Sequence, residues 1–210
     1  MYRTSGDHEP SASQALADLA AVEHVGYEAA LTEHREAWGR RWDEADVRIE
    51  GDEALQRAVR FALFHLMASV AYGGEAAVGA PGLSGPAYRG HVFWDACVFV
   101  LPFLAATHPA AARAMLEYRI RRLPAALATG RRGADFPWES AAGGEDVTPE
   151  SAFSHAGERL PVLTGRLAEH IVADVAYYVD WSGDSEFLAG AGGRLIVETA
   201  LLGLARGAGH

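Results

Sequence analysis

The sequence predicts an all-α protein with room for one domain of ordinary size. Its 210 residues and 22.4 kDa fit a single domain. Half of the residues are hydrophobic and 22% are charged, which is typical of a folded chain and not of a disordered one. Apolar residues recur every three or four positions in most segments, as they do on a helix face. No stretch alternates apolar and polar residues between hairpin turns, so we expect little β-structure.

Three helices are predicted in the first third of the chain. Residues 11–23 and 27–43 have helical composition, and the second of these segments carries charged residues along one side. Apolar residues then recur at helical spacing over 55–70, with Asp52 as the N-cap of that helix. Both faces become apolar from Phe61 onward, which predicts that the third helix is buried on most sides.

Four further helices are predicted after a glycine-rich loop at 73–90. The first two cover 93–106 and 109–129, and Pro109 suits the first turn of its helix because that N–H has no helical partner. A second long loop spans 130–165. The last two helices are marked by apolar faces, with Leu167, Ile171, Val175 and Tyr178 on one and Phe187, Leu195, Val197 and Leu201 on the other.

The two long loops are candidate functional segments. Loops longer than about 12–15 residues in a compact domain are usually functional or disordered. Besides glycine and serine, the two loops together contain Trp, Asp, Glu, Arg and His side chains, which favours function over a plain linker.

The charged residues and the cysteine content exclude several classes of protein. All 18 basic residues are Arg, so the chain has no lysine for a Schiff-base enzyme, a P-loop NTPase or a protein kinase. Cys97 is the single cysteine, which excludes an internal disulfide and a multi-cysteine zinc site. The net charge of −10 would repel a polyanion, so no nucleic-acid partner is expected.

The sequence favours a cytoplasmic protein with no membrane association. The N-terminal residues lack the apolar core of a signal peptide. The longest apolar run, 97–106, is about half the length of a membrane span and contains Pro102. We expect no metal site and no cofactor, because the sequence has no dinucleotide fingerprint and no HExxH-like spacing.

A pair of neighbouring Trp and acidic residues, Trp94-Asp95, lies where the glycine-rich loop passes into a helix. A carboxylate can accept hydrogen bonds from two adjacent sugar hydroxyls, and an indole ring can pack on the apolar face of a pyranose. The pair therefore predicts a sugar subsite. The structural alternative is that Asp95 caps its helix and Trp94 belongs to the core.

A second Trp–acid pair, Trp138-Glu139, lies in the other long loop, after Pro137, which restricts the backbone. Two such pairs in two loops fit a carbohydrate pocket better than either pair alone. The structural alternative here is a loop anchored by a buried Trp138 beside an exposed Glu139.

His170, Asp174 and Tyr177 fall on one face of a predicted helix, at spacings of four and three residues. This face could be a wall of the pocket or a His–carboxylate metal site. It could also be an ordinary helix face with an internal ion pair.

At these segments the sequence resembles glycoside hydrolase family 65, which comprises the kojibiose, maltose and trehalose phosphorylases and related hydrolases. The resemblance covers about residues 35–203, and the motifs follow one another in the family's order. The matching stretches are 60–66, 82–85, 88–95 and 99–109, then Tyr118-Arg119, Leu123-Pro124, 136–140, Thr148-Pro149, 169–171, Ala173-Asp174, Gly183-Asp184 and 186–188.

The resemblance implies the first part of an (α/α)6 barrel, in which inner and outer helices surround a pocket built by the connecting loops. Residues 1–50 would be a helical linker that precedes the barrel. Residues 51–210 would be the amino-terminal portion of an incomplete barrel domain.

The resemblance also assigns roles to the two Trp–acid pairs. Trp94 and Asp95 would hold the glucose whose bond is broken. Trp138 and Glu139 would add a second wall of the pocket. Arg89 would orient the loop or bind a hydroxyl.

The implied activity is inverting phosphorolysis or hydrolysis of an α-linked glucoside such as kojibiose, maltose or trehalose, with inorganic phosphate as the co-substrate of a phosphorylase. The family's general acid is a glutamic acid in a Pro-Asp-Glu-Tyr-like motif, which does not occur in this sequence. We therefore expect the general acid beyond the chain end and no turnover by these residues alone. Many members also carry an acid where this chain has Cys97.

The alternative is an inactive truncated product. Such a chain would bind sugar without turnover, form a homo-oligomer, or associate with a separate chain that carries the rest of the barrel.

Overall fold

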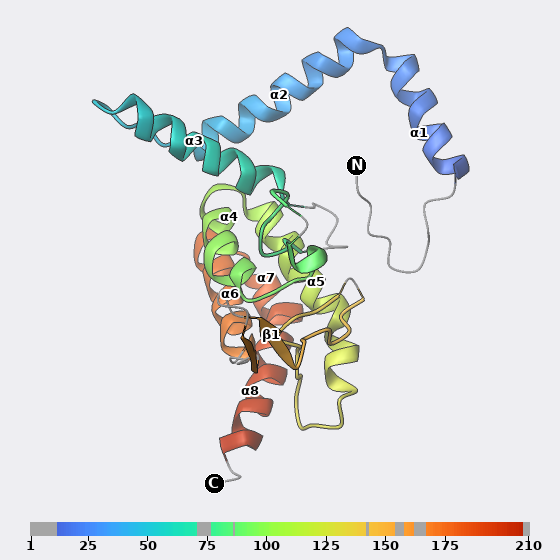
Figure 1. Ribbon diagram of the computed structural model, residues 1–210, viewed down its shortest axis with the longest axis vertical. Coiled ribbons are helices and arrows are strands. Elements are labelled where there is room, and N and C mark those ends of the chain that lie inside the picture. The colour runs from blue at the N-terminus through green and yellow to red at the C-terminus, as the bar shows by residue number, and fades with distance from the viewer. Residues whose placement is uncertain are drawn as a thin grey trace. The chain divides into compact units, whose positions relative to one another are not determined.

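Helices dominate the computed structural model (Figure 1), which describes residues 12–70, 77–85, 87–141, 143–153, 158–161 and 167–207. The strands within these ranges form one short antiparallel pair, so the predicted all-α class is confirmed. The chain divides into two compact units, Met1–Met67 and Ala68–His210.

The first unit holds three helices, as predicted: α1 (Ala12–Val25), α2 (Tyr27–Ala45) and α3 (Glu53–Ala68). Asp52 caps α3, because its Oδ1 accepts a hydrogen bond from the Leu55 N–H at 2.9 Å. The carboxylate of Asp46, directly after α2, accepts two hydrogen bonds from the Arg60 guanidinium, at 2.8 and 2.6 Å. This bidentate pair ties the end of α2 to the middle of α3.

The prediction that α3 is buried on most sides is wrong. Phe61 is 67% exposed and Leu55 is 49% exposed, whereas Leu63 and Met67 are the buried residues of this helix. The helix has few contacts within its own unit; one of them is the ring stack between Trp38 and Phe64, whose centroids are 4.9 Å apart.

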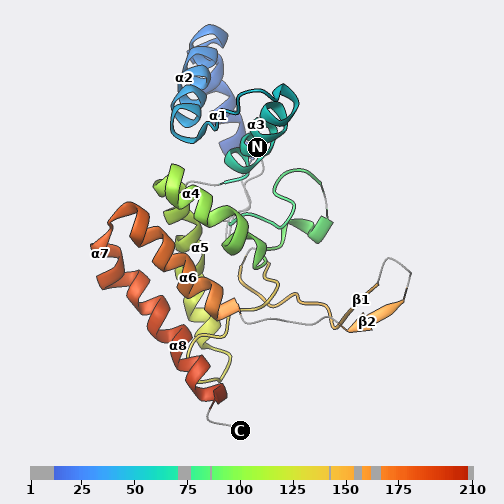
Figure 2. The same cartoon turned by 90° about the vertical axis from the view of Figure 1, so that its left-hand side faces the viewer.

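The second unit is built on four helices: α4 (Leu101–Thr107), α5 (Pro109–Leu127), α6 (Leu167–Ser182) and α8 (Gly193–Gly207). Helix α6 is central, because it packs against α4, α5 and α8, and Figure 2 shows it beside α8. The short elements are η1 (Ala87–Gly90), η2 (Ala96–Val100), β1 (Ser151–Phe153), β2 (Arg159–Pro161), α7 (Ser185–Phe187) and η3 (Leu188–Gly192). Large side chains with almost no exposure fill the interfaces: Leu101, Leu104, Leu116, Tyr118, Ile171, Val175 and Leu195.

The segment predicted as one helix over 93–106 is divided in the structure. Its first turn, η2, has π-helical hydrogen bonding, and α4 continues from it. Single π-helical turns inside helices occur frequently at functional sites. The predicted break is confirmed, because α4 ends at Thr107 and Pro109 opens α5.

The start of the second long loop is fixed against α8. The Ala134 N–H donates to the Glu198 carbonyl at 2.9 Å. Gly133 has a φ of +88°, and a Cβ there would lie 2.4 Å from the Glu198 carbonyl oxygen and the Leu202 nitrogen. Only glycine fits this approach, so the loop leaves α8 in a defined direction toward Phe136 and Trp138.

A second connection joins α5, α6 and α7 through Asp184. One carboxylate oxygen accepts hydrogen bonds from the Tyr178 hydroxyl at 2.7 Å and from Arg113 at 3.0 Å, and the other accepts from the Phe187 N–H at 2.9 Å. These bonds hold the pKa of Asp184 below its usual range, with the Tyr178 hydrogen bond as the largest cause. The Arg113 guanidinium also lies 4.1 Å from the centre of the Phe187 ring.

Within the described residues, Ser185–Ala205 is the one helical segment whose length and mean hydropathy, 1.4, would suffice to cross a membrane. Core helices of soluble proteins meet the same criterion. Here the segment is interrupted at Gly190, and its buried residues, Phe187, Gly192, Leu195, Thr199 and Leu202, lie on both sides of that interruption.

Candidate functional site

The two Trp–acid pairs lie side by side. The N–H of Val92 donates to the Ser140 carbonyl at 2.9 Å, and the N–H of Ser140 donates to the Val92 carbonyl at 3.0 Å. This reciprocal main-chain pair joins the residues just before Trp94 to the residue just after Glu139. The Tyr118 hydroxyl supports the joint from α5, because it donates to the Ala141 carbonyl at 2.9 Å.

The Val92–Ser140 pair brings the rings of Trp94 and Trp138 together, and the His170 ring of α6 lies beside Trp94. The Trp94 ring centroid lies 6.2 Å from that of Trp138 at an interplanar angle of 23°, and 6.0 Å from that of His170 at 29°. We call Trp94, Trp138 and His170 the aromatic cluster. Both Trp side chains are half-buried, as is His170, so the cluster keeps surface that a ligand can reach. Offset stacking of this kind fixes ring orientation as well as burying area.

Glu139 is buried and paired with His91. Its Oε1 lies 2.6 Å from the Nδ1 of His91, and the carboxylate side chain is only 9% exposed. The Glu139 N–H donates to the Thr148 hydroxyl at 3.0 Å, so the backbone is also held. The predicted alternative of an exposed Glu139 beside a buried Trp138 is therefore wrong on both residues. The sequence analysis missed His91, which adjoins the predicted Trp94 segment.

Asp95 follows Trp94 and precedes the π-helical turn. It is half-buried, and its side chain makes no capping hydrogen bond to that turn, so the structural alternative for Asp95 is not supported. In the sequence, Asp95 directly follows Trp94, a member of the aromatic cluster.

Arg89 lies at the entrance to the same segment, in a strained conformation. Tyr88 and Arg89 have φ values of 56° and 53°, which non-glycine residues rarely adopt. Both are exposed, and the Tyr88 ring packs edge-on against Phe93 with centroids 4.9 Å apart. Backbone strain of this kind clusters at ligand-binding loops, because the surrounding structure must maintain it.

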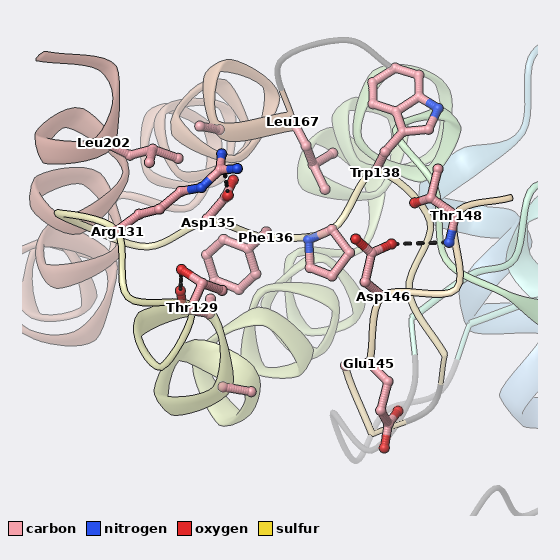
Figure 3. A pocket seen from close by; sticks show the side chains of 15 residues that line it. Thr129, Arg131, Asp135, Phe136, Trp138, Glu145, Asp146, Thr148, Leu167 and Leu202 are labelled. Carbon is pink, nitrogen blue, oxygen red and sulfur yellow. Dashed lines mark hydrogen bonds and ion pairs between the residues drawn. The ribbon is translucent and has the colours of Figure 1, made fainter. Parts of the chain in front are cut away.

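A cavity of about 440 Å³ lies beside Trp138, between the second long loop and the ends of α5, α6 and α8. Figure 3 shows Phe136 in its centre and Trp138 at one end. An ion pair between Arg131 and Asp135, at 2.9 Å, closes the other end next to Leu202.

Carboxylates supply much of the polar lining of this cavity. Asp146 accepts a hydrogen bond from the Thr148 N–H at 3.0 Å, and Glu145 lies near it. Of the five predicted site residues only Trp138 lines this cavity; Arg89, Trp94, Asp95 and Glu139 do not. Sequence reasoning missed Asp135 and Asp146, although both lie in the loop it had marked as functional.

The three residues predicted on one face of α6 have three different environments. His170 joins the aromatic cluster, Tyr177 is 47% exposed, and Asp174 is 3% exposed. The geometry favours the pocket-wall interpretation for His170 alone. Across the part of the chain that the structure describes, no group of three or more His, Cys, Asp or Glu side chains is arranged to hold a metal ion.

Asp174 lies against Cys97 and Arg119. Burial raises the pKa of Asp174 to about 7, although the Cys97 thiol and the Arg119 charge both act to lower it. Burial likewise raises the pKa of the Cys97 thiol, and the Asp174 charge adds to that effect. The thiol is therefore protonated at neutral pH and is a hydrogen-bond donor.

Comparison with known proteins identifies the family to which this all-α chain belongs. The chain belongs to glycosyl hydrolase family 65, whose central catalytic domain matches residues 60–209. The predicted fold, the first part of an (α/α)6 barrel, is confirmed by this match and by a solved structure of the same fold.

That structure, a candidate kojibiose phosphorylase from the human microbiome, superposes with a TM-score of 0.77 at 22% identity, over 96% of this chain and 30% of its own. A kojibiose phosphorylase of Thermoanaerobacter brockii is 40% identical over 90% of this chain and 26% of its own length. A kojibiose hydrolase of Flavobacterium johnsoniae is 36% identical over 93% of this chain and 28% of its own. The chain thus spans about a quarter of the length of these curated relatives.

Proposed function

We propose that this chain forms the glucose-binding part of an enzyme that acts on an α-linked glucoside such as kojibiose, maltose or trehalose. The observation that carries the proposal is the aromatic cluster, whose two Trp residues directly precede Asp95 and Glu139 in the sequence. Flat rings beside carboxylates are the arrangement that recognises a pyranose, because the rings cover its apolar face and the carboxylates accept its hydroxyl hydrogens.

The reaction we propose is inverting phosphorolysis or hydrolysis. Relatives of about 40% identity are named kojibiose phosphorylases and one of 36% is named a kojibiose hydrolase, which supports both forms of the reaction. In either form a carboxylic acid protonates the departing oxygen, while phosphate or water attacks the opposite face of the sugar. Phosphate would be a co-substrate; no cofactor or metal is part of the proposal.

The side chains of this chain would bind and orient the sugar. Trp94 and Trp138 would pack on it, and Asp95 would accept its hydroxyls. Glu139 is already paired with His91, so it would shape the wall and hold the Trp138 segment. Arg89 would orient the entrance loop or bind a hydroxyl.

Calorimetry with glucose, kojibiose, maltose and trehalose tests the binding. We expect heat from the unaltered protein and its loss in Trp94→Ala and Asp95→Ala, whereas Trp181→Ala, at a residue 62% exposed on α6, should bind as before. No heat for the unaltered protein would contradict the proposal.

We further propose that the 210 residues alone perform no turnover. Glu139, the most buried of the candidate carboxylates, is paired with His91 and so is poorly placed to give up a proton to a leaving group. Incubation with each disaccharide, with and without phosphate, should release neither glucose 1-phosphate nor glucose. Release of either product, abolished by Asp95→Ala, would overturn this proposal.

A second proposal is that the chain assembles, either with itself or with a chain that carries further barrel helices. Exposed apolar side chains on the last helices favour this reading: Tyr177, Trp181, Leu188, Val197 and Leu204 are each 40–69% exposed. Light scattering after gel filtration should give a mass above 22.4 kDa. A monomer at every concentration would contradict homo-oligomerisation. We propose a cytoplasmic location for the assembled protein.

A further inference from the structure

His91 holds the buried carboxylate of Glu139 in place. Its Nδ1 lies 2.6 Å from the Oε1 of Glu139. A carboxylate has no hydrogen to donate, so Nδ1 carries the hydrogen and donates it to Glu139. The Glu139 side chain is 9% exposed and the His91 side chain is 22% exposed, so this hydrogen bond lies largely out of water.

The register of the main-chain joint places this pair and the two indole rings on opposite faces. The joint is an antiparallel bridge, and alternate side chains of such a pairing point to opposite faces. His91 and Glu139 each lie one residue from the bridge, whereas Trp94 and Trp138 each lie two residues from it. The contacts agree with this register, because the first two side chains bond to each other and the two indole rings stack.

The main chain at Trp138 has few other constraints. Within the described residues, no hydrogen bond reaches the main chain of residues 136–138, and Pro137 has no N–H to donate. The last main-chain bond before this stretch runs from the Asp135 N–H to the Ala126 carbonyl, at 3.0 Å. The first residue held after it is Glu139, whose N–H, carbonyl and carboxylate are all bonded. The direction of the Trp138 side chain therefore depends on how Glu139 is held.

Loss of the hydrogen bond from His91 would be transmitted to Trp138. A buried carboxylate without a partner is unfavourable, so Glu139 would turn toward water. The preceding residue would turn with it, because its main chain has no hydrogen bond of its own among the described residues. The Trp138 ring would then leave its present orientation, 23° from the plane of Trp94.

We propose that His91 is a positioning residue for Trp138. It acts through Glu139, from the face of the joint opposite the indole rings, and it does not contact the sugar. The value of this role to a sugar site rests on the proposed function. The His91–Glu139 contact and the orientation of the Trp138 ring are properties of the protein without ligand, so they can be measured by themselves.

The test compares His91→Asn with His91→Gln. The asparagine amide nitrogen can take the place of Nδ1 and donate to Glu139, whereas the glutamine amide is one carbon farther out, in the place of Nε2. Neither variant has a ring at this position, so the comparison isolates where the donor lies.

The measurement is the indole N–H resonance of Trp138 in a ¹H–¹⁵N spectrum of the whole chain, assigned with Trp138→Phe. Stacking on Trp94 displaces this resonance, so it reports the orientation of the ring. We expect the resonance to shift from its position in the unaltered protein by more in His91→Gln than in His91→Asn.

Thr199→Val is the matched control for a lost hydrogen bond elsewhere in the core. Thr199 is 2% exposed on α8, and its hydroxyl bonds to the Leu195 and Ile196 carbonyls of its own helix. This variant should lose stability and leave the Trp138 resonance unchanged. Trp181, which is 62% exposed on α6, serves as an internal reference in every spectrum.

Equal Trp138 resonances in folded His91→Asn and His91→Gln would overturn the proposal. If neither variant folds, the imidazole ¹⁵N resonances of the unaltered protein decide: a hydrogen on Nδ1 of His91 supports the proposal, and a lone pair there overturns it. A larger shift in His91→Gln together with no sugar binding by the unaltered protein would uphold the positioning role and contradict the proposed function. Equal resonances together with sugar binding would do the reverse.

Discussion

The Nδ1 atom of His91 lies 2.6 Å from the Oε1 atom of Glu139, although 48 residues separate them in the sequence. The pair links the segment of Trp94 to the segment of Trp138. It adds a side-chain contact to the reciprocal main-chain bonds between Val92 and Ser140.

Removing the histidine from this pair should destabilise the protein. His91→Ala leaves a buried carboxylate without its partner, and we expect a loss of about 2–3 kcal/mol in the free energy of unfolding. Glu139→Gln keeps a hydrogen-bonding group of the same shape and should cost about 1 kcal/mol. Urea titration at neutral pH measures both. If the two variants lowered the free energy of unfolding equally, the unpartnered buried carboxylate would not be the cause of the loss in His91→Ala.

Stability should fall as the pH rises toward neutrality. Asp174 has a pKa of about 7 in the folded protein and 3.8 as an ordinary carboxyl, so the folded protein retains a proton that the unfolded chain releases. The free energy of unfolding contributed by this group should therefore decrease between about pH 4 and pH 7, by up to about 4 kcal/mol, and then level off.

Asp174→Asn should remove this pH dependence, because the amide does not titrate. Asp180→Asn, at an exposed residue of the same helix, is the control and should keep the wild-type profile. Denaturant midpoints measured across the range would distinguish them. A wild-type midpoint that rises from pH 5 to pH 7.5 would contradict the assignment.

Two glycines of the second long loop should respond differently to alanine. Gly130 and Gly133 have φ values of 78° and 88°, but only Gly133 has backbone atoms of α8 within 2.4 Å of a new Cβ. We expect Gly130→Ala to cost about 1 kcal/mol, from backbone strain alone. Gly133→Ala should cost about 3 kcal/mol, because α8 or the loop must also move. Thermal unfolding of both variants measures the difference, and equal costs would exclude the close approach.

The hydrogen bonds from Tyr178 and Arg113 to Asp184 should stabilise the protein beyond the contribution of Asp184 as the N-cap of α7. Asp184→Ala removes the bonds from Tyr178, Arg113 and the Phe187 N–H together, and we expect it to lower the free energy of unfolding by more than the loss of one of these bonds does. Tyr178→Phe removes one bond and should cost about 1 kcal/mol. Because the pKa of Asp184 is lowered, its contribution is present at neutral pH and is lost as the pH falls through the folded-state pKa. Calorimetric melting of both variants at pH 7 and at acid pH measures these effects.

The helices were predictable because their residues repeat with a regular period. Leu167, Ile171, Val175 and Tyr178 identified α6, and all four are buried. The π-helical turn at Ala96–Val100 was not predictable, because a nearly continuous apolar run has no period to analyse. The sequence also wrongly predicted that Phe61 of α3 is buried, because apolar residues on both faces of a helix do not show how many other elements pack against it.

The candidate site was predictable in its parts and not in its pairings. Residue type and loop position identified Trp94 and Trp138, whereas His91 pairs with Glu139 across two helices and a loop. Contacts over such separations depend on how α5 and α6 pack, which local patterns do not specify. For the same reason Asp174, assigned to the face of His170, proved to be a core residue beside Cys97.

The joint between the two Trp-bearing segments consists of main-chain hydrogen bonds from Val92 and Ser140. Main-chain bonds do not depend on which side chains flank them, proline excepted. The half-buried Trp94, Asp95 and Trp138 can therefore be varied together in a combinatorial library without removing the bonds that join the segments. The side chains at this place can therefore change in shape and charge while the two segments stay joined by their main chains.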